Sequence, residues 1–267
     1  MQKLGQHFLT NAAILQTIAA ALKIEKNETV IEIGPGHGEL TALLVDASEK
    51  LGGAVVSIEK DHSLIAPLEA LSGKATDGLL TIIEGDALKL LPDAVAGCQQ
   101  YKIVGNIPYY ITGKLLRIIS ELGEKPQRTV LLIQKEVAER ICAAPPAMNR
   151  LAASVQFWAD PKIITFVPRK DFSPAPDVDS AVIVLDKKNP ENVAQSVDPE
   201  LYYRAVRSIF AQPRKTLSNN LREAVGGAAG KEEIGAYLEK IGIDPEARPQ
   251  DLDIADIIRI TKTQTWG

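Results

Sequence analysis

The feature that most constrains the fold of this chain is a glycine-rich loop that follows a short apolar run. Thr29–Ile33 is rich in β-branched residues and is predicted as a buried strand, and it leads directly into Gly34-Pro35-Gly36-His37-Gly38. A helix is expected next, from Leu40 to Glu49. Strand, glycine loop and helix form the opening unit of a doubly wound α/β fold, where glycines let backbone N–H groups approach a ligand closely. The sequence therefore predicts a Rossmann-like sheet.

Acidic residues follow the next two predicted strands. Ala54–Ile58 ends in Glu59, roughly 20 residues beyond the glycine loop, where a carboxylate can accept hydrogen bonds from both hydroxyls of a ribose. Leu79–Ile83 is followed by Asp86, which can accept a hydrogen bond from the amino group of an adenine. These features predict a nucleotide-containing cofactor. The glycine loop and Glu59 alone allow either NAD or S-adenosylmethionine.

A fourth predicted strand, Tyr101–Val104, leads through a glycine into the sequence Asn106-Ile107-Pro108-Tyr109. Asn106 offers an amide oxygen, and Pro108 has no N–H, so the local backbone can present carbonyl oxygens without a competing donor. Two acceptors suit an exocyclic amine, and Tyr109 adds a flat face on which a base can stack. This chemistry fits an adenine or cytosine amino group. The alternative is a strand-to-helix turn with an Asn cap and a packing Tyr.

The overall charge argues mildly against a nucleic-acid partner, because the net charge is −4 and the pI is about 5.6. One stretch has the opposite character. Leu201–Arg222 contains no acidic residue and five basic ones, Arg204, Arg207, Arg214, Lys215 and Arg222. If the chain binds RNA, this stretch is where phosphate contacts are expected.

Other features narrow the class of protein. Cys98 and Cys142 have no paired spacing, so neither a disulfide framework nor a zinc site is expected, and a reducing cytoplasm fits best. The three histidines lack the helical pairing of metal sites, so no metal is expected. The N-terminus lacks the pattern of a signal peptide, and no apolar run approaches membrane-spanning length, so no membrane association is expected.

The order of these motifs resembles S-adenosylmethionine-dependent N6-adenine methyltransferases, and in particular the ribosomal RNA adenine dimethyltransferases. The resemblance extends over almost the whole chain. It is carried by Leu4-Gly5-Gln6-His7-Phe8-Leu9, Glu32-Ile33-Gly34-Pro35-Gly36-His37-Gly38, Glu59-Lys60-Asp61, Gly85-Asp86-Ala87-Leu88, Asn106-Ile107-Pro108-Tyr109-Tyr110-Ile111, Gln134-Lys135-Glu136-Val137-Ala138 and Phe172-Ser173-Pro174-Ala175-Pro176-Asp177-Val178-Asp179-Ser180.

The resemblance implies a methyltransferase domain over residues 1–187 and a small all-α domain over residues 188–267 that contributes to rRNA binding. It implies that S-adenosylmethionine is the cofactor. The residues it assigns to cofactor binding are Gln6, His7, Leu9, Gly34, Gly36, Gly38, Glu59, Asp86, Ala87 and Asn106. The residues it assigns to catalysis are Asn106, Pro108, Tyr109 and Phe172.

Phe172 lies between two predicted strands, Ile163–Val167 and Ser180–Leu185, in a loop stiffened by Pro174 and Pro176. We expect an exposed phenylalanine there, which would either fasten the loop or form the second face of a base sandwich. The family pattern favours the sandwich, with Tyr109 as the first face.

The implied activity is dimethylation of N6 on two adjacent adenines in a 3′-terminal hairpin loop of small-subunit rRNA, within a 30S particle, by a monomer. The sequence departs from the family pattern in Gln212-Pro213-Arg214-Lys215-Thr216-Leu217, which keeps only one of the two arginines that are common before Lys-Thr-Leu. Three alternatives remain open at this point. They are a resistance methyltransferase acting on large-subunit rRNA, a non-catalytic RNA-binding assembly or transcription factor with the same fold, and, more distantly, an NAD-dependent reductase.

Overall fold

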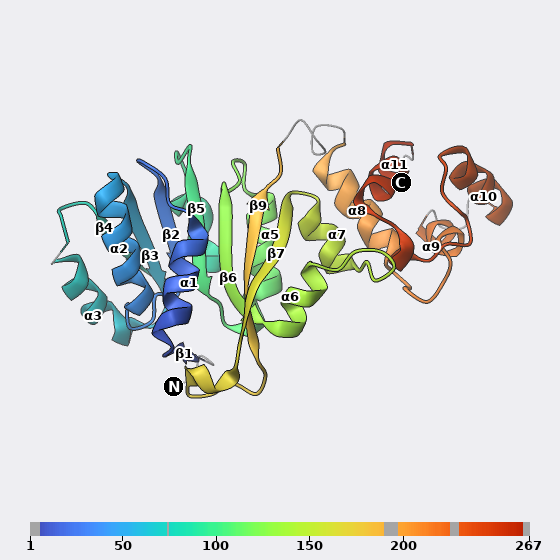
Figure 1. Cartoon of the computed structure of the whole chain (residues 1–267). Helices are drawn as coiled ribbons and strands as arrows, with labels where there is room; N and C mark the ends of the chain where they lie inside the picture. The colour runs from blue at the N-terminus through green and yellow to red at the C-terminus, as the bar shows by residue number, and fades with distance from the viewer. Residues whose placement is uncertain (1–5, 74, 190–196, 225–229, 264–267) are drawn as a thin grey trace. The chain divides into compact units, whose positions relative to one another are not determined.

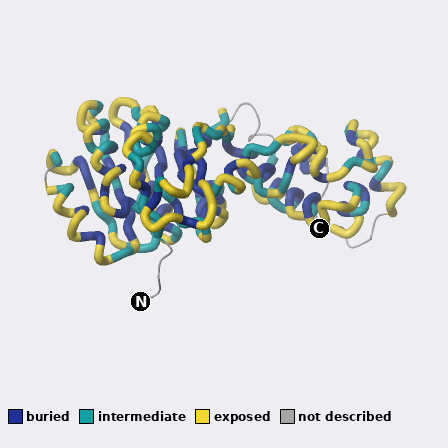
Figure 2. Tube along the Cα trace, turned by 60° about the horizontal axis from the view of Figure 1, so that its bottom comes forward, coloured by how far each residue is buried: buried dark blue, intermediate teal, exposed yellow. Residues whose placement is uncertain are grey.

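The computed structural model describes residues 6–73, 75–189, 197–224 and 230–263. This part of the chain divides into two compact units. The sheet unit comprises Met1–Ala138 and Pro161–Lys187, and the helical unit comprises Glu139–Asp160 and Lys188–Gly267. Each unit has its own buried core, coloured dark blue along the chain trace in Figure 2.

Within the described residues, seven strands form one sheet in the order β4-β3-β2-β5-β6-β9-β7 (Figure 1). Most residues facing either side of the central strands are apolar, as expected for a sheet covered on both faces. The strands are β2 (Thr29–Ile33), β3 (Ala54–Glu59), β4 (Leu80–Glu84), β5 (Tyr101–Asn106), β6 (Arg128–Gln134), β7 (Ala159–Val167) and β9 (Ser180–Lys187).

The direction of the strands fixes where a ligand can bind. The pairs β2–β3, β2–β5, β3–β4 and β5–β6 are parallel, whereas β9 is antiparallel to β6. The chain moves outward from β2 in one direction to β3 and β4, and then returns to place β5 on the other side of β2. This reversal creates a switch point beside the carboxyl end of β2, the usual ligand position in such sheets. The predicted fold class is confirmed.

Helices cover both faces of the sheet. Figure 1 shows α1 in front of the sheet and α5 behind it, and α1 packs beside α2. Helix α1 begins after Asn11, whose side chain caps it by accepting hydrogen bonds from the backbone N–H groups of Ala13 and Ile14. The helices that start in the sheet unit are α1 (Ala12–Leu22), α2 (Glu39–Leu51), α3 (His62–Ser72), α4 (Ala87–Ala94), α5 (Thr112–Glu121) and α6 (Lys135–Ile141).

A second, two-stranded sheet joins distant parts of the chain. Strand β1 (Phe8–Leu9) pairs antiparallel with β8 (Phe172–Ser173), and Leu9 lies opposite Phe172. The His7 ring also bonds the Pro174 carbonyl oxygen at 2.8 Å. These contacts hold the N-terminal motif against the loop that precedes β9.

The helical unit contains more of the chain than the sequence indicates. Its core includes Ala153 and Phe157 from the segment Glu139–Asp160, which we assigned to the first domain. Phe157 stacks on Tyr202 with ring centroids 3.8 Å apart, and the buried Tyr202 hydroxyl donates to the Ala153 carbonyl oxygen at 3.0 Å. Glu139–Asp160 belongs with the helices because its apolar side chains pack there.

The helices of this unit surround that core, and Asp198 caps the first of those that follow residue 188 by accepting from the N–H groups of Glu200 and Leu201. They are α7 (Arg150–Gln156), α8 (Pro199–Ile209), α9 (Leu217–Ala224), α10 (Lys231–Lys240) and α11 (Ile254–Thr263). Among the helices of the described residues, none combines the length and the apolar character needed to cross a membrane. The pair Gly226-Gly227, a glycine sequence that favours a break between helices, lies outside the described residues.

Candidate active site

A cavity of about 220 Å³ opens at the carboxyl ends of β2, β3, β4 and β5. The register places these ends level with one another, since Ile33 lies opposite both Ile58 and Gly105, and Glu59 lies opposite Glu84. The predicted site residues that line the cavity are Gln6, His7, Leu9, Gly34, Gly36, Glu59, Asp86, Ala87, Asn106, Pro108, Tyr109 and Phe172. Motifs scattered along the chain therefore meet in one site.

Among the residues assigned to cofactor binding and catalysis, Gly38 is the one that does not line the cavity. It caps α2 with a φ of 91°, and a Cβ built there would come within 2.5 Å of the Leu71 side chain. The glycine is required for the turn and for the close approach of α3. Gly36, with a φ of 62°, does line the cavity and lies directly under the Phe8 ring.

Glu59 is buried and held by the backbone. Its Oε1 accepts from the N–H groups of Lys60 and Asp61, each at 2.7 Å, and its Oε2 accepts from Gly36 N–H at 3.2 Å. A carboxylate has about four acceptor positions, so at least one remains for a ligand hydroxyl. The backbone of two separate loops thus fixes the orientation of this carboxylate.

Asp86 is already engaged on both oxygens. Oδ1 accepts from Leu88 N–H at 3.0 Å as the cap of α4, and Oδ2 accepts from the Lys60 ammonium at 3.1 Å. Partial burial acts to raise the pKa of Asp86, but the bonds from Lys60 and Leu88 hold that pKa below its usual value. A ligand amino group would have to share Asp86 with Lys60, a residue whose role the sequence did not indicate.

Glu32 is a second lining residue that sequence reasoning missed. It is 1% exposed, and its Oε2 accepts from the hydroxyls of Thr41 and Ser57, both at 2.7 Å. Its Oε1 has no hydrogen-bond partner among the described residues. Burial raises the pKa of Glu32 to about 7, although the two hydroxyls oppose the shift. An acidic residue inside an otherwise apolar strand was the signal that could have identified it.

Asn106 ends β5 with its amide orientation fixed. Its Nδ2 donates to the His7 carbonyl oxygen at 2.9 Å, so the acceptor Oδ1 is left for another partner. The Pro108 carbonyl oxygen accepts from Ile111 N–H at 3.1 Å and retains one lone pair. Two acceptors therefore stand close together in the chain at one wall of the cavity.

Tyr109 is positioned by its hydroxyl, which shares a hydrogen bond of 2.8 Å with the Ser180 hydroxyl. Burial raises the pKa of Tyr109 above its ordinary value, so the ring stays neutral at physiological pH. The ring that lies nearly parallel to it is that of His7, with centroids 6.2 Å apart and planes 24° apart. Tyr110, the next residue, is 68% exposed at the cavity wall.

Phe172 does not have the exposed position that we expected. It is only 6% exposed and belongs to the core of the sheet unit, because β8 pairs with β1 and carries the ring inward. It still contributes to the cavity wall. Its burial favours a packing role over that of a free stacking surface.

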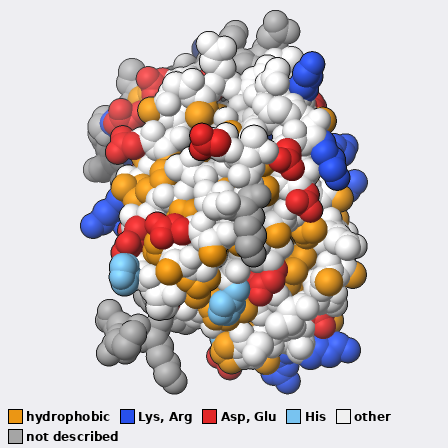
Figure 3. Space-filling view, turned by 90° about the vertical axis from the view of Figure 1, so that its left-hand side faces the viewer, with side chains coloured by type: hydrophobic (Ala, Val, Ile, Leu, Met, Phe, Trp, Pro, Cys, Tyr) orange, Lys and Arg blue, Asp and Glu red, His pale blue; other side chains and the backbone are white. Residues whose placement is uncertain are grey.

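The five basic residues of Leu201–Arg222 lie in the helical unit and differ in their partners. Arg204 pairs with Glu200 at 3.6 Å and Lys215 pairs with Glu223 at 2.6 Å. The remaining three are exposed and form no ion pair with any described residue; they are Arg207, Arg214 and Arg222. By contrast, Figure 3 shows acidic and apolar side chains across the middle of the face at the β4 and α3 end, with lysines and arginines toward its margins.

Comparison with known proteins agrees with this geometry. The sequence model of the family described as "Ribosomal RNA adenine dimethylase" matches residues 1–265. A protein of Dehalococcoides mccartyi strain CBDB1, named ribosomal RNA small subunit methyltransferase A, is 37% identical over 255 residues, which cover 95% of this chain and 84% of that protein. A protein of the same name from Latilactobacillus sakei is 38% identical over 267 residues, covering 97% and 88%.

Solved structures are similar as well. A dimethyladenosine transferase from Plasmodium falciparum superposes with a TM-score of 0.79 at 26% identity, covering 95% of this chain and 96% of that one. The 23S rRNA methyltransferase ErmE gives a TM-score of 0.73 at 23% identity, with 96% and 98% covered, and so shares the fold. These matches agree with the two-unit fold of this chain and with the convergence of its motifs on one cavity. The chain therefore belongs to the ribosomal RNA adenine dimethylase family.

Proposed function

We propose that this protein transfers methyl groups from S-adenosylmethionine to N6 of adenine in small-subunit rRNA. The substrate would be two adjacent adenines of a 3′-terminal hairpin loop, each dimethylated, within a 30S particle assembling in the cytoplasm, and the enzyme would act as a monomer. The observation that carries the proposal is the orientation of the Asn106 amide. Its Nδ2 donates to the His7 carbonyl oxygen, so its Oδ1 is left to accept a hydrogen bond from a ligand. Family membership supports the same activity.

The cavity fits the proposed cofactor. It has apolar walls and carries two carboxylates, those of Glu59 and Asp86. Gly34 and Gly36 have no side chains, so a ligand can approach the backbone of the glycine loop closely. Glu59 would hold the ribose hydroxyls and Asp86 the adenine amine, while Gln6, His7, Leu9 and Ala87 would close the walls. When bound, S-adenosylmethionine supplies an electrophilic methyl group, so the protein has to supply position.

Positioning of the target nitrogen falls to Asn106 and Pro108. Adenine N6 is a poor nucleophile because its lone pair is delocalised into the ring. Accepting its two hydrogens at Asn106 Oδ1 and the Pro108 carbonyl would favour a pyramidal nitrogen with an available lone pair. After the first methylation one N–H remains, so the second transfer would rely on one acceptor. The extra proton on the product nitrogen can leave to water, and no dedicated base is required.

The target base has to leave its stack, and aromatic surfaces can replace the lost stacking. Tyr109 would provide one face. His7 would provide the other more readily than Phe172, since the His7 ring lies nearly parallel to Tyr109 whereas Phe172 is part of the core. Tyr109→Phe should then be mild, because the ring remains, and Tyr109→Ala should lose about 1–3 kcal/mol of stacking.

Contacts to rRNA phosphates would come from the basic residues of the helical unit. Arg207, Arg214 and Arg222 are exposed there, with Arg204 and Lys215 partly neutralised by neighbouring acids. The modest number of unengaged cations favours a preassembled particle as the substrate over naked RNA, since ribosomal proteins would add further contacts.

The activity can be tested with labelled S-adenosylmethionine and unmethylated ribosomal particles. We expect label in dimethyladenosine of 30S particles and none in 50S particles. Label confined to 50S particles would identify a large-subunit enzyme instead. Binding of both cofactor and 30S particles without any transfer would identify a non-catalytic RNA-binding protein.

A further inference from the structure

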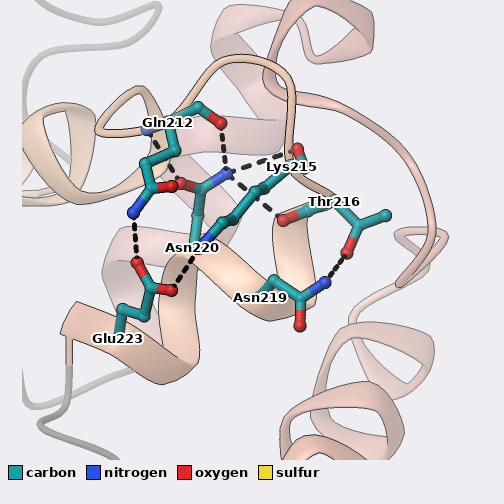
Figure 4. A network of polar contacts seen from close by, with 6 residues as sticks. All are labelled: Gln212, Lys215, Thr216, Asn219, Asn220 and Glu223. Carbon is teal, nitrogen blue, oxygen red and sulfur yellow. Dashed lines mark hydrogen bonds and ion pairs between the residues drawn. The ribbon is translucent and has the colours of Figure 1, made fainter.

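The turn between α8 and α9 is held by hydrogen bonds from one buried side chain, that of Asn220. Asn220 is 1% exposed, and its Nδ2 donates to the carbonyl oxygens of Gln212, Thr216 and Lys215 at 3.1, 3.2 and 3.4 Å (Figure 4). Its Oδ1 accepts from Gln212 N–H at 3.0 Å. One buried side chain therefore fixes the backbone of residues 211–216, here called the 211–216 turn, before any ligand arrives.

The 211–216 turn presents exposed side chains to solvent, and one acid from α9 engages two of them. Glu223 Oε1 lies 2.6 Å from the Lys215 ammonium, and Glu223 Oε2 accepts from Gln212 Nε2 at 2.6 Å. Both carboxylate oxygens are thus directed at the turn (Figure 4). Arg214, on the same turn, is exposed and has no ion pair with any described residue.

A carboxylate and a phosphate oxygen make the same charge-assisted bond to an ammonium group, so they compete for it. The Lys215 and Glu223 side chains are 44% and 41% exposed, and ion pairs at such positions are weak enough for an incoming phosphate to displace. The turn therefore offers RNA one unengaged cation, Arg214, and one cation that must first leave its acidic partner.

We propose that Glu223 is an intramolecular competitor of rRNA phosphate for Lys215 and thereby limits the affinity of the 211–216 turn for RNA. The inference rests on the proposed function, which assigns this surface to rRNA. It also gives a role to Gln212, which lies on the same turn as Lys215 and donates to Glu223. A neutral Gln212 can bond Glu223 and help to hold the acid over Lys215.

Replacing Glu223 by glutamine tests the proposal directly. Glu223→Gln keeps the size of the side chain and can still accept from Gln212, but it removes the charge that competes with phosphate. We expect the variant to bind unmethylated 30S particles about two- to fivefold more tightly, with a steeper dependence of affinity on salt. Glu233→Gln removes the same charge from an exposed site on α10 and should change affinity less.

Lys215→Ala in two backgrounds separates competition from a general charge effect. In the otherwise unchanged protein we expect only a small loss of affinity, because Lys215 is engaged. In the Glu223→Gln background the same substitution should cancel the whole gain. Equal effects of Lys215→Ala in both backgrounds, or an unchanged affinity in Glu223→Gln, would overturn the proposal.

Arg214→Ala distinguishes failure of this inference from failure of the proposed function. Weaker 30S binding in Arg214→Ala with no response to Glu223→Gln would reject the competition and keep the surface as an RNA contact. No response to either substitution would reject both. Thermal unfolding of each variant should match that of the unchanged protein, because the exposed side chains involved contribute little to the core.

Discussion

Glu59 and Asn106 at the cavity and Lys215 at the basic surface are held in different ways. In the sheet unit, Glu59 accepts from three backbone N–H groups and Asn106 donates to a backbone carbonyl. In the helical unit, Lys215 is held by the side chain of Glu223, itself partly exposed. A backbone partner can be changed only by moving the chain, whereas a side-chain partner can be displaced by a ligand or removed by one substitution. The cofactor site is therefore coupled to the fold, and the basic surface is adjustable.

The largest expected effect tests the coupling between the cofactor site and the fold, and it is expected in Phe172→Ala, because Phe172 belongs to both the cavity wall and the core. Because the ring is buried in the core of the sheet unit, its removal should lower the free energy of unfolding by about 3–5 kcal/mol. Denaturant titration followed by circular dichroism measures this change. The matched variant Tyr109→Ala truncates a half-buried ring and should cost less stability. Equal stability of Phe172→Ala and the unchanged protein would return Phe172 to the role of a free stacking surface.

Glu32→Gln tests the coupling between the cofactor site and the fold through the dependence of folding stability on pH. The pKa of Glu32 is raised by burial from 4.5 to about 7, so between these values the folded protein holds a proton that the unfolded chain has released. Stability should consequently fall as pH rises through this window, by about 3 kcal/mol at most.

In Glu32→Gln that fall should disappear, and unfolding titrations at pH 5, 6, 7 and 8 would measure it. Asp46→Asn, which removes an exposed acid on α2 that does not contribute to the pKa of Glu32, should keep the slope of the unchanged protein. A slope that persists in Glu32→Gln would show that another group is responsible.

The fold was predictable where its determinants are local. Thr29–Ile33 is a strand with the expected bounds, and Asn11 and Asp198 begin helices, because alternation, glycine loops and caps act within a few residues. The position of the site was predictable as well, because the carboxyl ends of parallel strands lie at the same edge of the sheet.

What could not be predicted depends on contacts between distant segments. Phe172 is buried because β8 meets β1 from the other end of the chain. Glu139–Asp160 joins the helical unit because Phe157 finds Tyr202 there. The engagement of Asp86 by Lys60 likewise requires two strands to be placed side by side. No pattern within a single segment contains this information.

Glu59→Ala should weaken cofactor binding by about 1–3 kcal/mol, since charge-assisted hydrogen bonds to the ribose would be lost. Titration calorimetry with the demethylated cofactor product measures the loss, and NAD should not bind. Glu84→Ala is a suitable control because Glu84 lies opposite Glu59 in the register but does not line the cavity. Similar losses in both variants would argue against a specific ribose contact.

The smallest effect on binding is expected at the basic surface formed by Leu201–Arg222 of the helical unit. Arg207→Ala should weaken 30S binding severalfold and reduce the salt slope by about 1, while the unfolding free energy stays within about 0.5 kcal/mol. Lys240→Ala is the control, because Lys240 occupies the last turn of α10 as Arg207 occupies the last turn of α8. A salt slope unchanged by Arg207→Ala would remove this residue from the RNA contact.

The central claim is that Asn106 accepts a hydrogen of adenine N6 during methyl transfer, and single-turnover methylation of 30S particles by Asn106→Ala tests it most directly. The interaction matters mainly in the transition state, so formation of both mono- and dimethyladenosine should be abolished while folding and 30S binding persist. Dimethylation by Asn106→Ala at a rate close to that of the unchanged protein would contradict the claim.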